Sequence, residues 1–176
     1  MTDLRYPIGP FEYDGRMSDS RRAECVARIA AAPRRLRAVV TGLDDTQLDT
    51  PYRPGGWTVR QLVHHVPDSH INAYTRVRLA LTEDTPTIKP YEEARWAELP
   101  DARALPVEIS LRLLESLHAR WVPLLEGVGG AGGARPLRHP EHGRLMTVDE
   151  LIALYAWHGD HHTAHVTGLR ERMGWR

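Results

Sequence analysis

The sequence predicts an all-α fold, a four-helix bundle with long connecting loops and one small hairpin, in a single domain that spans residues 1–176. Apolar residues recur at spacings of three and four in four long stretches, which is the period of a helix with one buried face. Segments dense in Pro, Gly, Asp and Thr separate these stretches, as expected of loops. The expected helices cover residues 18–41, 58–82, 106–127 and 147–173.

The first helix follows an irregular arm. Residues 1–17 are rich in Pro, Gly and Tyr, and such an arm is ordered only where it packs on another surface, for example a second subunit. Ser18 or Asp19 can cap the helix that follows. Pro33 is expected to kink this helix because proline removes a backbone donor.

The second helix begins at Thr58, which forms a capping box with Gln61. Two adjacent stripes run along it. An apolar seam includes His70, and the stripe beside it has a polar middle; this second stripe contains His65, Asn72 and Arg76. Pro67 is expected to break or bend the helix next to these residues.

A long connection over residues 83–104 contains three prolines, and connections of this length are often lids or binding loops. Tyr91 and Trp96 are interpreted as anchors that hold it to the bundle. The third helix is expected to bury Ile109, Leu113, Leu114, Leu117, Trp121 and Leu124. Residues 135–146 fit a small hairpin turning at HPEHG, with His139 and His142 as surface residues.

The last helix carries the most informative pattern. It is expected to start with a capping box of Thr147 and Glu150. A seam with spacings of four and three then continues along it, as in the core of a bundle. The seam consists of Leu151, Tyr155, His158, His162, His165 and Leu169. Buried imidazoles without partners cost about 1–3 kcal/mol each, so the histidines in this seam need partners.

A metal ion is the shared partner that best fits His158 and His162, because side chains four residues apart project from a helix together. His161 and His165 form a second pair, but His161 leaves the seam. The sequence has no HExxH, so the metalloprotease arrangement is absent. Two ligands hold a metal poorly, and the second helix offers His64, His65 or His70 as a third.

Composition limits the partners and the compartment. The 23 basic and 23 acidic residues balance, so no net charge attracts nucleic acid or an acidic membrane. Cys25 is the single cysteine, which suits a reducing compartment. The start of the chain has no apolar run typical of a signal peptide, and no stretch reaches about 20 apolar residues. We therefore expect a soluble, cytoplasmic protein.

Three stretches of the sequence resemble the YfiT-like metal-dependent hydrolases, a branch of the DinB superfamily. They are YRPGGWTVRQLVHHVPDSHINAY, TEDTPTIKPYEEARWAEL and LYAWHGDHHTAHV, and the resemblance extends from YPIG to RMGW. It implies a homodimeric four-helix bundle with one divalent ion per subunit, zinc or nickel, held by three histidines. Carried over residue by residue, the ligands are His65, His158 and His162. Pro67 is a departure, since relatives have a small non-proline residue there.

The resemblance implies hydrolysis of a small electrophilic substrate by metal-activated water. The alternative is a transferase that joins a low-molecular-weight thiol, bacillithiol, to electrophilic compounds. A second alternative is a metal-stabilised protein that binds a small ligand without catalysis. His165 is the expected general base for water, and Asn72 and Arg76 are the expected substrate-binding residues, of the amide and cationic types that an acidic thiol requires.

Overall fold

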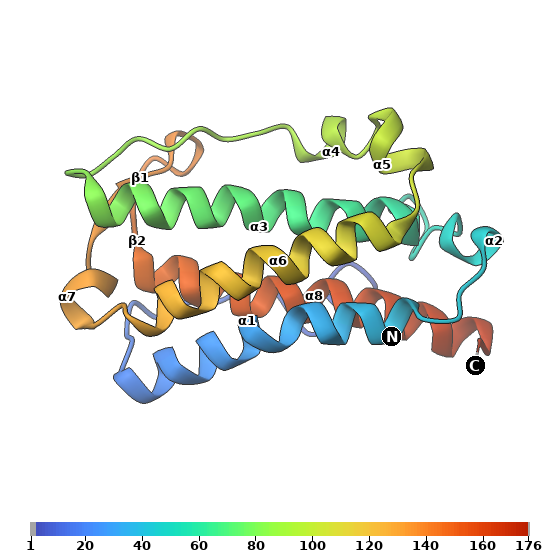
Figure 1. Cartoon of the computed structure of the whole chain (residues 1–176), viewed down its shortest axis with the longest axis horizontal. Helices are drawn as coiled ribbons and strands as arrows, with labels where there is room; N and C mark the ends of the chain where they lie inside the picture. Colours follow the sequence, from blue (N-terminus) through green and yellow to red (C-terminus); the bar gives the residue numbers. More distant parts are fainter. Residues whose placement is uncertain (1–2, 176) are drawn as a thin grey trace.

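Four long helices form the bundle in the computed structural model, which describes residues 3–175. They are α1 (Asp19–Val40), α3 (Val59–Thr82), α6 (Val107–Glu126) and α8 (Val148–Met173). Helices α1 and α3 each pack against both α6 and α8. Figure 1 shows α1 and α8 running in one direction and α3 and α6 in the other. The predicted all-α four-helix bundle is confirmed.

Parallel helices that follow each other in the chain require a long return. The connection from α3 to α6 crosses the length of the bundle beside α3 (Figure 1) and contains α4 (Glu93–Trp96) and α5 (Pro100–Ala104). The other short elements follow α1 or precede α8. They are α2 (Asp45–Leu48), α7 (Gly130–Gly133), β1 (Pro136–Arg138), the 3-10 helix η1 (Pro140–His142) and β2 (Leu145–Thr147).

The expected hairpin is present and is joined to the connection. Pro136 of β1 pairs with Thr147 of β2 in antiparallel register. On the other side of β1, Ile88 N–H donates to the carbonyl of Arg138 at 3.0 Å, and Arg138 N–H donates to the carbonyl of Pro86 at 2.9 Å. Backbone hydrogen bonds therefore join the connection and the hairpin into one continuous layer.

Local sequence signals explain where α1, α3 and α8 start. Ser18 Oγ accepts from Arg21 N–H, and the capping box of Thr58 and Gln61 is complete. At α8, Thr147 Oγ1 accepts from Glu150 N–H at 3.2 Å. The expected reciprocal bond is absent, because the Glu150 carboxylate pairs with Arg144 instead.

Neither proline divides its helix, and the bends expected at Pro33 and Pro67 stay predictions. Pro33 lies inside α1 and Pro67 inside α3, and both helices continue as single elements through these positions. Each proline removes one backbone donor from its helix. Tertiary packing on both sides outweighs that loss, since Pro33 and Pro67 are both buried.

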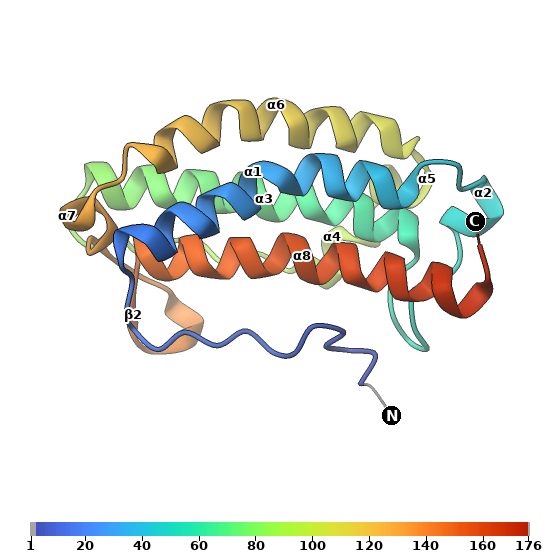
Figure 2. The same cartoon turned by 90° about the horizontal axis from the view of Figure 1, so that it is seen from below.

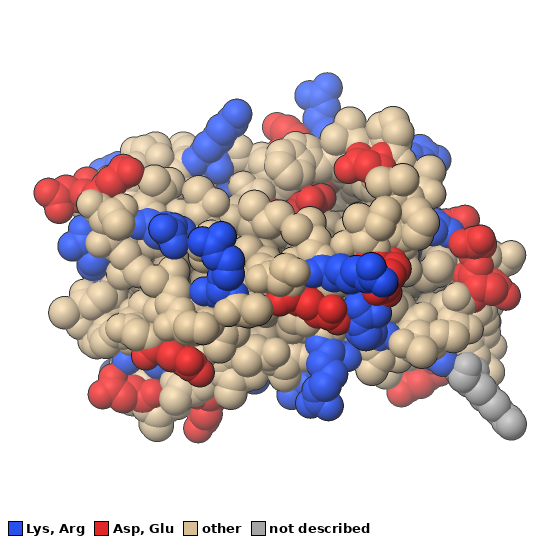
Figure 3. Space-filling model, viewed as in Figure 1, with Lys and Arg blue, Asp and Glu red and all other residues tan. Residues whose placement is uncertain are grey.

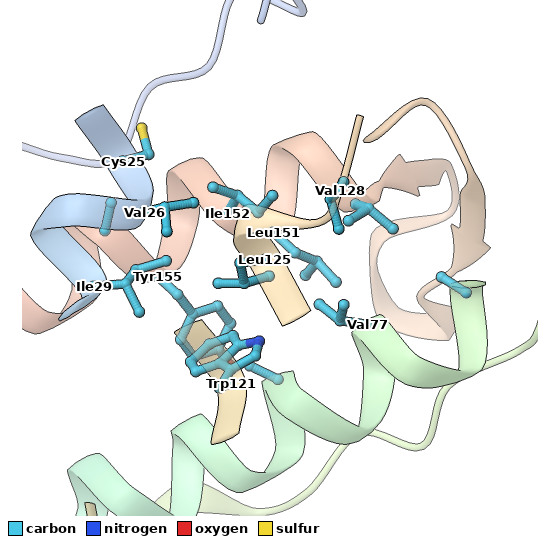
Figure 4. Close-up of a cluster of buried hydrophobic side chains, with 14 of the residues drawn as sticks. Cys25, Val26, Ile29, Val77, Trp121, Leu125, Val128, Leu151, Ile152 and Tyr155 are labelled. Atoms are coloured by element: carbon cyan, nitrogen blue, oxygen red, sulfur yellow. The ribbon is translucent and has the colours of Figure 1, made fainter. Parts of the chain in front are cut away.

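The apolar core is divided along the bundle into two clusters. One surrounds Trp121 at the end of the bundle near α7 and the hairpin (Figure 4), and includes Ile29, Val77 and Leu151. The other, at the opposite end, includes Leu36, Leu62, Leu114 and Val166. Along α3, α6 and α8, buried histidines such as His70, His118 and His162 come between the residues of these two clusters, so the centre of the bundle is polar.

Helix α6 buries Leu114 and Trp121 as expected, but two other residues of the expected face are exposed. Ile109 is 52% exposed and Leu113 is 42% exposed. The buried residues are Ser110, Leu111, Leu114, His118, Trp121 and Leu125. The helix is rotated toward Ser110 and His118 because both side chains hydrogen-bond to histidines of α3, which apolar periodicity cannot show.

The N-terminal arm lies along α8 of its own chain (Figure 2), where Trp157 Nε1 donates to the carbonyl of Gly9 at 3.1 Å. Contacts within the subunit therefore hold this arm in place.

Acidic and basic side chains are interspersed on the face shown in Figure 3. Within residues 3–175, no helix combines the length and apolar character that a membrane crossing requires.

A buried ion pair joins the starts of α1 and α8. Arg22 donates through Nε to Asp149 Oδ1 at 2.7 Å and through Nη2 to Oδ2 at 3.1 Å, and the two residues are 6% and 8% exposed. Gly133 of α7 lies against the same carboxylate, where an added Cβ would overlap it. This glycine therefore leaves room for the pair.

Replacing Asp149 with Ala leaves the Arg22 charge buried without its bidentate partner. We expect the free energy of unfolding, measured by urea denaturation, to fall by about 3–5 kcal/mol. Asp160→Ala is the control, because Asp160 pairs with Arg28 and Arg35, which are 41% and 45% exposed, and it should cost about 1 kcal/mol or less. Equal losses in the two variants would contradict this account.

Candidate metal centre

Three histidines from two helices converge at the polar centre of the bundle. His65 comes from α3, and His158 and His162 lie one turn apart on α8. One nitrogen from each lies within 4.8 Å of the other two. The Nε2 atoms of His158 and His162 are 3.1 Å apart. Nitrogens bound to one tetrahedral zinc ion are separated by about 3.3 Å, so the spacing fits a shared ion.

Burial keeps these rings in the form that binds metals. It lowers the pKa of His65 to about 4. It also lowers the pKa values of His158 and His162 well below their usual range, with the neighbouring histidines adding to the effect. Only neutral imidazole has a lone pair for an ion, so the group has the right protonation state at neutral pH. The Nδ1 of His162 is buried without a hydrogen-bond partner among the described residues.

Two further histidines extend from this group into the core. His158 Nδ1 lies 3.2 Å from His70 Nε2, and His70 Nδ1 lies 2.8 Å from His118 Nε2. His118 Nδ1 in turn lies 2.8 Å from the backbone carbonyl of Ile29 in α1. Burial lowers the pKa of His118 to about 4, and its bond to that carbonyl opposes the shift.

A cavity of about 570 Å³ opens onto the three histidines. Helices α3 and α8 supply its inner surface, including Ser69, whose Oγ lies 3.4 Å from His158 Nε2. Loops supply its outer walls: Tyr52, Arg53 and Trp57 precede α3, Tyr91 and Glu93 lie in the connection, and His139 and Glu141 lie in the hairpin. The cavity thus combines aromatic rings with both signs of charge.

Comparison with known proteins places this chain in a family. The sequence profile of the DinB superfamily matches residues 28–166. The chain belongs to the DinB superfamily. It is 54% identical, over 99% of its length and the whole of the relative, to a Bacillus mycoides protein named "Putative metal-dependent hydrolase BcerKBAB4_2443". A Bacillus cereus (strain 03BB102) protein named "Putative metal-dependent hydrolase" is 53% identical over the same shares.

A solved structure has nearly the same fold. YfiT from Bacillus subtilis, described as a probable metal-dependent hydrolase with an unusual four-helix bundle topology, superposes with a TM-score of 0.97. It is 43% identical, and the match covers 99% of this chain and all of that one. The resemblance to this branch, seen in the sequence motifs, is confirmed.

Among the three histidines proposed as the third ligand, the structure brings His65 to the pair on α8. His64 faces α5 and α6 instead, where its Nδ1 lies 2.7 Å from Ser110 Oγ and its Nε2 lies 3.0 Å from the carbonyl of Leu105. His70 contacts His158 from the side opposite the cavity. Spacing alone left these three equivalent, and the resemblance favoured His65.

The other predicted site residues lie at different depths. Arg76 lines the cavity, and its Nη2 donates to the carbonyl of Lys89 at 3.1 Å. His165 is buried beneath the ring of Tyr52, with its Nε2 3.0 Å from His161 Nε2, and it does not line the cavity. Asn72 also lies outside the lining and donates to the carbonyl of Asp68 at 2.9 Å. The roles of His165 and Asn72 stay predictions.

Several residues at this site were not anticipated. His161, expected to leave the seam, is 8% exposed and lines the cavity, because the N-terminal arm and Trp157 cover it. His139, expected at the surface, is also 8% exposed and lines the cavity, because the hairpin folds over α8; the side chain of His142 lies outside the described residues. Glu93 and Glu141 add carboxylates that no motif indicated.

The buried histidines predict a steep acid sensitivity of the metal-free protein. Their folded pKa values, about 4 for His65, His118 and His161, lie below the unfolded value of about 6.5. Between these values the unfolded chain binds more protons, so stability is complete above about pH 6.5 and falls as the pH decreases.

Each such histidine contributes up to about 1.4 kcal/mol per pH unit. We expect urea denaturation in the presence of a chelator to show a loss of about 3 kcal/mol or more between pH 7 and pH 5. A free energy of unfolding that stays level over this interval would show that these histidines titrate normally in the folded state.

Proposed function

We propose that this protein is a metal-dependent hydrolase that binds one divalent ion, zinc or nickel, through His65, His158 and His162 and activates water for attack on a small electrophilic substrate. A divalent ion held by three neutral histidines acts as a Lewis acid and makes water, or a thiol, nucleophilic near neutral pH. The convergence of three buried imidazole nitrogens within 4.8 Å, facing a cavity, is the observation that carries the proposal.

The cavity limits the size and character of the substrate. Its volume of about 570 Å³ is within the range of small-molecule sites. Trp57 packs on His65 with ring centroids 4.7 Å apart, and Tyr91 and Trp157 add further aromatic surface to the walls. These rings place apolar surface beside the histidines and can stack on a planar substrate.

Water attack also needs a base to accept a proton. Glu93 and Glu141 line the cavity and are the carboxylates within its walls. His165 takes part through His161: their Nε2 atoms are 3.0 Å apart, and the ring of His161 lines the cavity. A proton accepted by His161 can therefore be shared with His165.

The second candidate function is transfer of a low-molecular-weight thiol, and the two cavity arginines favour it. Arg53 and Arg76 both line the cavity, and each has a buried Nε without a hydrogen-bond partner among the described residues. An acidic thiol cofactor would place its carboxylates against these guanidinium groups. Its sulfur would then form the new bond to the electrophile, whose leaving group departs with the bonding electrons.

The ligand assignment predicts about one zinc or nickel ion per chain after metal loading, measured by elemental analysis. Replacing His65, His158 or His162 with Ala should remove stable binding, because two ligands hold an ion poorly. His64→Ala is the matched control: it removes an adjacent buried histidine that faces α6, and it should keep the metal. A full metal complement in His158→Ala would overturn the assignment.

The nature of the nucleophile predicts a different pattern of activity in variants. The metal-loaded protein should be screened on esters, amides and alkylating electrophiles, with and without an acidic thiol. For a hydrolase, turnover needs no thiol, His165→Ala lowers kcat about 100-fold or more, and Arg76→Ala changes it little. For a transferase, turnover requires thiol, and Arg76→Ala raises the KM for thiol about tenfold. Strict thiol dependence would reject the hydrolase.

A further inference from the structure

A line of hydrogen-bonded histidines crosses the whole bundle behind the metal group. It starts at His158 in α8, passes through His70 in α3 and His118 in α6, and ends at the carbonyl of Ile29 in α1. The three contacts measure 3.2, 2.8 and 2.8 Å, so each is within hydrogen-bond distance. Each of the four long helices contributes one group.

The surroundings of this line keep the imidazole rings of His70 and His118 neutral. His70 is fully buried and His118 is 3% exposed. The rings of Trp121 and Tyr155 pack edge-on against His70, with centroids 5.6 and 5.2 Å away. No carboxylate among the described residues hydrogen-bonds to either ring. A buried imidazolium without a counter-charge is costly, so each ring carries one proton and accepts at its other nitrogen.

The carbonyl of Ile29 sets the direction of every bond. A carbonyl oxygen can only accept, so His118 donates from Nδ1 and its Nε2 must accept. His70 therefore donates from Nδ1 to His118, which leaves His70 Nε2 as an acceptor. His158 must then donate from Nδ1 to His70.

The consequence appears at the metal group. With its proton on Nδ1, His158 has its lone pair on Nε2, the atom that lies 3.1 Å from His162 Nε2. The hydroxyl of Ser69, 3.4 Å away, faces the same atom and can donate to it. His162 differs from His158 in this respect: its Nδ1 is buried without a hydrogen-bond partner among the described residues, so no second ring fixes its tautomer from that side.

We propose that His70 and His118 are positioning residues that hold His158 in the Nδ1-protonated tautomer, with its Nε2 lone pair directed at the metal site. The inference rests on the proposed metal site but not on the reaction. Groups that orient a ligand histidine in this way typically contribute 10- to 100-fold to metal affinity. Here that group is itself a histidine, and its orientation derives from a backbone carbonyl on the opposite side of the core.

The first test uses the metal-free, full-length protein labelled with nitrogen-15. Long-range proton–nitrogen spectra at pH 7.5 distinguish the two histidine tautomers. We expect His70, His118 and His158 all to carry their proton on Nδ1, with nitrogen–nitrogen couplings across the two N–H···N bonds. An Nε2-protonated or mixed tautomer at His158 would overturn the inference, whether or not the protein binds metal.

The second test measures zinc affinity by competition with a chromophoric chelator. His118→Leu removes the acceptor for His70, and we expect zinc affinity to fall about 10- to 100-fold. His118→Gln should stay within about threefold of the wild type, because its amide donates to Ile29 and its oxygen accepts from His70.

His64→Leu is the matched control, since it removes a buried histidine that also bonds to a backbone carbonyl and lies outside the line. It should bind zinc as the wild type does. Unchanged affinity in His118→Leu, or an equal loss in His64→Leu, would overturn the positioning role. If His118→Leu does not fold, His118→Gln and the tautomer spectra decide. A wild type that binds no zinc would reject the metal site, whereas the tautomer pattern would still be measured independently.

Discussion

The fold depends on satisfying a layer of neutral imidazole rings between two apolar clusters. Each ring presents one donor and one acceptor, and leaving either unpaired in a dry interior costs free energy comparable to a lost hydrogen bond. The helices must therefore meet in a register that brings ring nitrogens within about 3 Å of their partners. His118 of α6 meets this requirement toward α3 and α1 at once. Polar pairing thus selects one helix alignment more sharply than apolar packing does.

The same requirement shows where the layer is open. Toward the core, His70 and His118 complete each other's hydrogen bonds. Toward the cavity, the nitrogens of His65, His158 and His162 face one another without an acidic or backbone partner among the described residues. Nitrogen lone pairs that lack hydrogen-bond donors destabilise the folded protein when the site is empty, and they become favourable when they surround a cation. The stability of the fold and the proposed metal binding therefore depend on one arrangement of histidines.

The sequence indicated most of the fold because its signals were local. Seam spacing predicted α8, and the capping box at Thr58 predicted the start of α3. His118 was missed because it belongs to no histidine cluster in the sequence, and its partners are a ring on another helix and a carbonyl 89 residues away. Glu141 and His139 were missed for a similar reason: their approach to α8 depends on how the hairpin folds. Long-range pairing leaves no periodic pattern in the sequence.

The division of the cavity between helices and loops has an evolutionary consequence. The three histidines of the proposed metal site lie on α3 and α8, which are held by the core, whereas Arg53, Glu93 and Glu141 lie on surface segments. Surface loops accept replacement more readily than packed helices. Substitutions in these walls can therefore alter which compounds are accepted while the three histidines stay in place. Members of one lineage can in this way acquire different substrates through loop changes alone.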